Sequence, residues 1–343
     1  MFLRRILLVP VLLIFFFTAD ILPQKYPDAN VHSLMERGIN FLAGARYDSA
    51  KAVFTRLEKY HPKNPFGPLY LAAVEIVKGF DWGVPFNRAY ILDKLERAED
   101  LTDDLMDANS KNVWHNYAAA MVYAFEAYYD FIQEDWFGVF KTGTDALKYF
   151  EKCSTLDKKF YEAGSAMAIF DYWKSSKTKD LSWLPFVEDN SEQAIKILER
   201  NRKFYSYNDF LLANSLAWIY IDKKQYAKAV SLCDDVLRKA PGNRIIKWTK
   251  ARALEEIDRK KAIDVYRVIL SQFPATTNYY YFNIVTLKHK MAMNYEKLKM
   301  YKEALKLCEE ILAIKNFNSH DKKKLADRLK RVKTLRDSLK KRV

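Results

Sequence analysis

Residues 211 to 241, LLANSLAWIYIDKKQYAKAVSLCDDVLRKAP, are the stretch of this chain that decides its fold. Apolar residues recur in its first half at spacings that place them on one face of a helix: Ala213, Leu216, Ala217 and Tyr220. A polar break at residues 222–224 interrupts this stripe, and the spacing then resumes at Tyr226, Ala229, Cys233, Val236 and Leu237. Pro241 cannot continue the second helix because proline lacks the backbone N–H. The stretch therefore predicts two short helices joined as a hairpin.

The same order of residues returns three times elsewhere in the chain. One copy holds Leu34, Gly38, Phe41, Tyr47, Ala50, Phe54, Leu57 and Pro62. A second holds Trp248, Ala251, Ala262, Tyr266, Ile269 and Pro274, and the connection between its helices is about two residues short of the usual repeat. A third holds Met291, Ala292, Tyr295, Tyr301, Ala304, Cys308 and Ile311, with Lys288 at the tryptophan position and Asn316 at the proline position.

This order resembles the tetratricopeptide repeat (TPR), a helical hairpin of about 34 residues. The resemblance implies an all-α, right-handed α-solenoid of about seven helical hairpins with a C-terminal capping helix. It places repeats at residues 32–62, 211–241, 244–274 and 278–316, three extended hairpins over 66–204, and a cap at 319–343. Segment 160–187 also looks like uncharacterised secreted bacterial TPR proteins. A TPR chain is expected to be a non-catalytic scaffold for a protein or peptide partner.

The extended hairpins share an unusual feature in their connections. Each connection carries a tryptophan followed by a phenylalanine: Trp82 and Phe86, Trp136 and Phe140, Trp183 and Phe186. Equivalent loops of a solenoid stack along one edge, so these six rings are expected to line up. Two interpretations stay open, an additional strip of core or an exposed ridge for a partner or a membrane interface.

The TPR resemblance also implies where a partner binds, because first helices line the concave surface of the solenoid. The residues at those positions are Met35, Ile39, Asn214, Trp218, His289 and Met293. Several of them are apolar, so an apolar groove that takes an extended or helical segment fits better than a carboxylate clamp. Each residue could also serve packing alone.

The positive charge of the chain is concentrated at one end. The whole chain carries a net charge of +14, but residues 26–238 hold 27 Lys and Arg against 31 Asp and Glu. Residues 239–343 hold 27 against 11, a net charge of +16. The alternative function is therefore binding to a membrane surface or another anionic polymer through this basic third. Its last helix, residues 319–343 with Ser319 as the expected N-cap, is either a cap or an anion-binding helix.

The N-terminal residues 1–24 are typical of a secretory signal. Arg4 and Arg5 precede an apolar run from Ile6 to Ala19, which is too short for a bilayer-spanning helix of about 20 residues. We expect an exported protein of a bacterial periplasm or cell envelope, anchored in the membrane if the segment is not cleaved. That location argues against nucleic acid as a partner.

Residues suited to catalysis or metal binding are scattered. Cys153, Cys233 and Cys308 lie far apart at positions that favour small apolar groups, which predicts buried free thiols. The five histidines form no metal-binding spacing, and no phosphate-binding or nucleophile motif occurs. The sequence therefore predicts no catalytic residue, metal, cofactor or small-molecule substrate. An enzyme would need a site assembled from distant repeats.

Overall fold

The computed structural model describes residues 24–178, 189–204, 206–273 and 281–343. Within these ranges the chain forms fifteen α-helices and no strand, which confirms the predicted all-α fold. The N-terminal hairpins are α1 (Ala29–Ala43) with α2 (Tyr47–Tyr60), and α3 (Phe66–Trp82) with α4 (Arg88–Asn109). The central ones are α5 (Val113–Gln133) with α6 (Trp136–Leu156), and α7 (Tyr161–Thr178) with α8 (Ser191–Asn201). The last three are α9 (Asp209–Asp222) with α10 (Tyr226–Lys239), α11 (Arg244–Ile257) with α12 (Arg259–Ser271), and α13 (Tyr281–Lys297) with α14 (Tyr301–Leu312).

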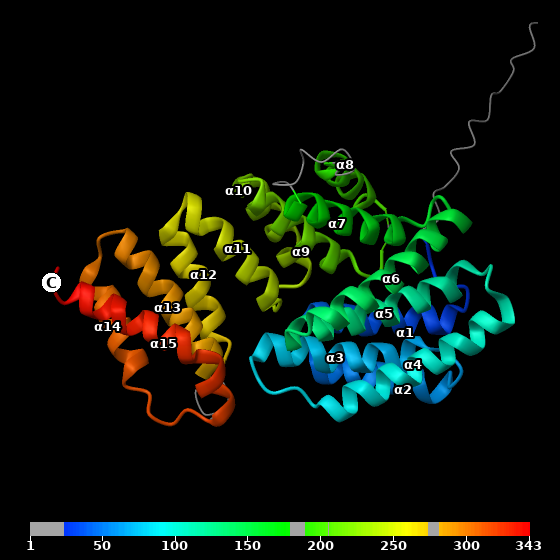
Figure 1. Cartoon of the computed structure of the whole chain (residues 1–343), viewed down its shortest axis with the longest axis horizontal. Helices are drawn as coiled ribbons and strands as arrows, with labels where there is room; N and C mark the ends of the chain where they lie inside the picture. Colours follow the sequence, from blue (N-terminus) through cyan, green and yellow to red (C-terminus); the bar gives the residue numbers. More distant parts are fainter. Residues whose placement is uncertain (1–23, 179–188, 205, 274–280) are drawn as a thin grey trace, which may run out of the picture.

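These seven hairpins follow one another as a curved stack, and α15 (Ser319–Leu339) packs against α13 and α14 at its end (Figure 1). No helix in the described ranges combines the length and apolarity needed to cross a bilayer. Residues 1–23 of the expected signal segment lie outside the described residues, and so do Trp183 and Phe186.

Three hairpins turn in the same way. Their connections are three residues long, and the central residue has a left-handed backbone: Ala45 (φ 57°), Lys224 (φ 58°) and Lys299 (φ 60°). The next amide in each turn donates to a carbonyl five residues earlier, as in a Schellman ending: Arg46 to Phe41 (2.8 Å), Gln225 to Tyr220 (2.7 Å), and Met300 to Tyr295 (2.9 Å). Only Asp258 separates α11 from α12, so the shortened connection predicted in that repeat is present.

Small residues allow the helices to approach closely, as the repeat pattern predicts. Ala217 and Ala229 are fully buried. A methyl group added to Gly38 would lie 2.4 Å from Cζ of Phe54, so only glycine fits this crossing. The predicted burial of the free thiols is confirmed for Cys153, Cys233 and Cys308.

The extension of the central hairpins lies mainly in the helices. Helices α4, α5 and α6 are 22, 21 and 21 residues long, against 15 and 14 for α1 and α2. Trp136 was expected in a connection but is the first residue of α6, while Trp82 is the last residue of α3. The two tryptophans are therefore not at equivalent positions, and the predicted stack of equivalent loops is wrong for this pair.

The last helix begins one residue away from its expected cap. Asn318 is the N-cap of α15, and its side chain accepts a hydrogen bond from the Asp321 amide (2.7 Å). Ser319, the expected N-cap, is the first residue of the helix. The apolar stripe of α15 faces the stack, with Leu325, Val332 and Leu339 fully buried.

Candidate functional site

The inner face of the N-terminal repeat is covered by the chain itself. Met35 and Ile39 of α1 are 0% and 3% exposed and share a core cluster with residues of α9. Near the start of α1, Tyr207 contacts His32, with 2.5 Å between its hydroxyl oxygen and Nδ1 of the imidazole. Hence Met35 and Ile39, expected to line an open groove, are packing residues in this structure.

The turn between α10 and α11 closes the other end of the same face. Asn243 donates its side-chain amide to the Ala43 carbonyl at the end of α1 (2.7 Å). A methyl group on Gly242 would lie 2.5 Å from the carbonyl oxygen of Gly44, so the two turns are in contact. Tyr207 and Asn243, which flank the α9–α10 hairpin in the chain, thus contact the two ends of α1.

A buried ion pair fixes this arrangement, and we call it the clasp: Asp81 at the end of α3 with Arg244 at the start of α11. The two groups form a bidentate pair, with Arg244 Nε 3.0 Å from Asp81 Oδ1 and Nη2 bonded to Oδ2. Tyr47 donates to the same carboxylate (2.6 Å), and burial and Asp81 raise the pKa of its hydroxyl. The guanidinium also lies over the rings of Trp82 and Phe273, 5.0 and 5.2 Å from their centroids. Residues more than 160 positions apart are therefore joined in a buried, bidentate ion pair.

The inner face of the C-terminal half, formed by α9, α11, α13 and α15, stays open. Trp218 on α9 is 36% exposed and Met293 on α13 is 42% exposed. Asn214, one turn before Trp218, accepts a hydrogen bond from the Thr249 hydroxyl of α11 (2.7 Å), which joins these two first helices. Trp218 and Met293 are thus accessible to solvent, while Asn214 connects two helices.

Comparison with solved structures places this arrangement among known folds. The chain is similar to a chain of the human IFIT1 dimer with PPP-AAAA, with 16% identity, a TM-score of 0.51, and 87% of this chain and 65% of that chain covered. It is also similar to the C-terminal part of a TPR repeat-containing protein from Cytophaga hutchinsonii, with 17% identity, a TM-score of 0.42, and coverage of 85% and 99%. A third similarity is to the APC/C hetero-tetramer Cut9-Hcn1, with 15% identity and a TM-score of 0.49. There the match covers 88% of this chain but spans only half the length of that chain. No protein-family model and no curated protein matches the sequence.

The fold is a TPR-type right-handed α-solenoid. The repeated turns, the small residues at the crossings and the terminal cap agree with that assignment. In a TPR solenoid the first helix of each hairpin faces inward, so the exposed residues of α9, α11 and α13 are on the inner face.

Positive side chains gather at the end of the TPR inner face, and we call them the cationic cluster: Arg252 of α11, His289 and Lys290 of α13, and Arg328 and Arg331 of α15. Arg328 Nη1 lies 3.4 Å from His289 Nδ1, and because arginine can only donate, this nitrogen of His289 carries no proton. Burial, with Arg328, Arg331 and Lys290 nearby, lowers the pKa of His289 to about 4. Burial, with Arg252 and Arg328, lowers the pKa of Lys290 to about 8.

Within the described ranges, one carboxylate forms ion pairs with members of this cluster. Glu255 is 6% exposed and pairs with Arg252 and with Lys290 (3.5 Å). Arg328 and Arg331 have no carboxylate within ion-pair distance in the described ranges. His289, expected to line the groove, is 3% exposed and lies under α15 instead. The cluster therefore has an excess of positive charge that an anionic group would neutralise.

The aromatic residues of the TPR connections divide into two groups. Trp82 packs against Phe273, with ring centroids 5.9 Å apart, and Phe86 packs against Gly79 and Tyr129. Trp136 and Phe140, by contrast, are 65% and 76% exposed. Trp82 and Phe86 are thus packed against other rings, whereas Trp136 and Phe140 are exposed.

Two carboxylates elsewhere in the chain have raised pKa values because they are buried. Glu162 accepts hydrogen bonds from the Ser206 hydroxyl (2.6 Å) and the Asn208 amide (3.0 Å), and burial raises its pKa. Burial and the neighbouring Glu99 and Asp130 raise the pKa of Glu126 to about 7. Within the described ranges no three His, Cys, Asp or Glu side chains converge as metal ligands.

Sequence reasoning missed the clasp and the cationic cluster. Asp81, Arg244 and Arg328 belong to no repeat consensus, and their contacts join segments far apart in the chain. The charge of the C-terminal third was a usable signal for the cationic cluster, but it could not select four side chains among 27 Lys and Arg, and it gave no indication of His289.

Proposed function

We propose that this protein is a non-catalytic scaffold that holds an acidic, partly apolar segment of a partner protein along its C-terminal inner face. The observation that carries the proposal is the cationic cluster on α11, α13 and α15, in the half of the solenoid where Trp218 of α9 and Met293 of α13 are exposed. A partner segment would place apolar side chains on these two residues and carboxylates on Arg328 and Arg331. Large apolar anchors next to charges that become desolvated are typical of binding hot spots.

The TPR fold supports a protein partner but does not select one. The covered N-terminal groove restricts the proposal to one half of the solenoid, because Met35 and Ile39 offer no surface to a ligand. Asn214 and His289 support the binding face from beneath, through Thr249 and Arg328.

A peptide titration tests this proposal. Fluorescence anisotropy would compare an amphipathic peptide of Glu and Leu with one of Lys and Leu, and we expect the acidic peptide to bind at least about tenfold more tightly. The double variant Arg328→Glu with Arg331→Glu should bind the acidic peptide about tenfold or more weakly than wild type. Trp218→Ala should bind it about threefold or more weakly.

The matched control changes the same amount of charge on the outer face. Lys302 and Lys306 are exposed on α14, and their double substitution by Glu should alter binding by less than about twofold at 0.15 M salt. Equal losses in both double variants would show a general charge effect and reject a site at the cationic cluster.

We further propose export to a bacterial envelope, on the basis of the basic start and the apolar run of residues 6–19. Mass spectrometry of the N-terminus after expression with a secretion pathway should find the first 19 to 24 residues removed. An intact N-terminus in the membrane fraction would favour the anchored form, and an intact N-terminus in the cytosol would contradict export.

A further inference from the structure

The turn between α5 and α6 carries a group of exposed rings, which we call the aromatic tip: Phe131, Trp136, Phe137 and Phe140. Their exposed fractions are 50%, 65%, 80% and 76%. Phenylalanine and tryptophan are usually buried, so four such rings within ten residues call for a specific explanation. Phe131 and Trp136 contact each other edge to face, with centroids 5.7 Å apart, and form the base of the group.

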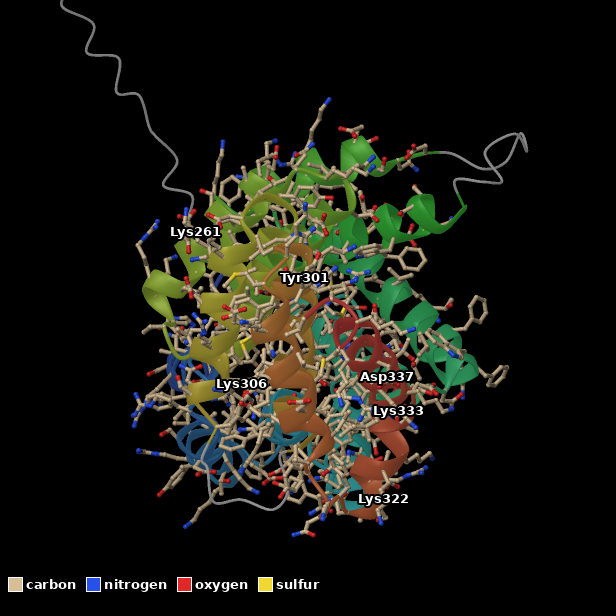
Figure 2. All side chains as sticks on the ribbon, turned by 90° about the vertical axis from the view of Figure 1, so that its left-hand side faces the viewer. Lys261, Tyr301, Lys306, Lys322, Lys333 and Asp337 are labelled. Atoms are coloured by element: carbon tan, nitrogen blue, oxygen red, sulfur yellow. The ribbon has the colours of Figure 1, made fainter. Side chains whose placement is uncertain are left out.

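Local geometry makes these rings project. Glu134 turns the chain with a left-handed backbone (φ 64°), and the Asp135 side chain caps α6 by accepting from the Gly138 amide (3.1 Å). Trp136 and Phe137 therefore occupy the first turn of α6, and Phe140 follows one turn later on the same side. In Figure 2 this green segment forms the right-hand edge of the molecule, and side chains stand out from it into solvent. Rings that project in this way can insert into a deformable surface.

The charges beside the aromatic tip favour an anionic surface. Lys324 of α15 lies 3.4 Å from Glu134, which brings the start of α15 next to the turn. Lys322 and Lys323 are exposed and have no carboxylate within ion-pair distance in the described part of the chain; Lys322 is labelled at the lower end of α15 in Figure 2. The carboxylates at the turn are already engaged: Asp135 caps α6, Glu134 pairs with Lys324, and Asp130 accepts from the Thr142 hydroxyl (3.5 Å).

We propose that the aromatic tip inserts into the interfacial region of an anionic lipid bilayer, with Lys322 and Lys323 contacting lipid phosphates. Tryptophan and phenylalanine partition into this region, and each lysine near an anionic leaflet adds to the affinity. The binding is peripheral, and its lysines lie on the first turn of α15, before Arg328 and Arg331 of the cationic cluster. The scaffold would thereby hold its partner at a membrane.

Vesicle flotation tests the proposal with the full chain. Wild type is expected to bind vesicles of phosphatidylcholine with about 30% phosphatidylglycerol, and to bind pure phosphatidylcholine at least about threefold more weakly. Phe137→Ala with Phe140→Ala should reduce binding to both by about tenfold or more. Tyr60→Ala is the matched control, because Tyr60 is 63% exposed on α2, far in sequence from the tip. It should bind like wild type.

Lipid charge is tested separately. Lys322→Glu with Lys323→Glu should remove the preference for anionic vesicles, and Lys302→Glu with Lys306→Glu should keep it. Quenching of tryptophan fluorescence by brominated lipid should be clearly weaker in Trp136→Phe than in wild type.

Three results would overturn the proposal: no vesicle binding by wild type, unchanged binding by the double phenylalanine variant, or quenching unaffected by Trp136→Phe. A dimer in sedimentation analysis that dissociates in the double phenylalanine variant would also overturn it. That result would assign the rings to an interface between copies of the chain.

Discussion

Ile39, Trp218 and Met293 occupy the same position in three repeats, directly after the small residue of each first helix. Their exposed fractions are 3%, 36% and 42%. The repeat pattern makes them equivalent, yet Tyr207 and the turn after α10 lie against the two ends of α1, while the C-terminal inner face is open. Local spacing thus sets which side of a helix faces inward, and contacts between distant repeats decide whether that side meets solvent.

The largest effect is expected from breaking the clasp. Arg244→Ala leaves the Asp81 carboxylate buried without its partner, and such a change typically costs about 3–5 kcal/mol of unfolding free energy. Urea denaturation gives this value directly. Arg238→Ala is the control, since Arg238 forms an exposed pair with Asp235 and should cost less than about 1 kcal/mol. Similar costs for both variants would show that the clasp does not hold the two halves together.

Substituting Ile39 and Met293 separately by alanine tests the comparison between these two equivalent positions. Ile39→Ala removes buried methyl groups and should destabilise the protein by about 2–5 kcal/mol. Met293→Ala shortens an exposed side chain, so it should change the unfolding free energy by less than about 0.5 kcal/mol. It should nevertheless weaken binding of the acidic peptide. Thermal unfolding and peptide anisotropy measure the two effects, and a large loss of stability in Met293→Ala would mean that the C-terminal face is also packed.

A smaller change should loosen the cover of the N-terminal groove. In Gly242→Ala the new methyl group collides with the Gly44 carbonyl, and such overpacking costs about 1–3 kcal/mol. Hydrogen exchange should become faster in α1, because its cover opens more often. Gly143→Ala is the control: its methyl group would lie 4.0 Å from Ala127, so the substitution should be neutral or slightly stabilising.

Features within one repeat could be predicted from the sequence, whereas contacts between distant repeats could not. The hairpins, their turns, the cap and the buried thiols follow from spacing within about 34 residues, and these predictions are confirmed. The burial of Met35 and Ile39 depends on contacts made by Tyr207 and Asn243, which lie about 170 to 200 positions further along the chain. Nothing in a single repeat encodes that contact. Trp82 and Trp136 were treated as equivalent, but one ends a helix inside the core and the other starts a helix in solvent.

The last predicted effect is the contribution of His289, in the C-terminal half, to the pH dependence of stability. His289 has its pKa lowered to about 4 by burial and by Arg328, Arg331 and Lys290, while its pKa in the unfolded chain is near 6.5. Between these values the unfolded chain binds the proton and the folded chain does not. The folded state therefore loses stability as the pH falls from 6.5 toward 4, by about 2 kcal/mol for this residue.

Glu126 acts in the opposite direction, because its pKa of about 7 favours the folded state as the pH falls. The contribution of His289 is therefore measured as a difference between variants: in urea denaturation at pH 7 and at pH 4.5, the loss of stability at low pH should be smaller in His289→Gln than in wild type. Saturating acidic peptide should also shrink it, because carboxylates near Arg328 and Arg331 favour a protonated His289. An equal pH dependence in wild type and variant would place the titration elsewhere. A pH dependence that peptide does not change would indicate that the ligand lies away from the cationic cluster, and that the open face binds through Trp218 and Met293 alone.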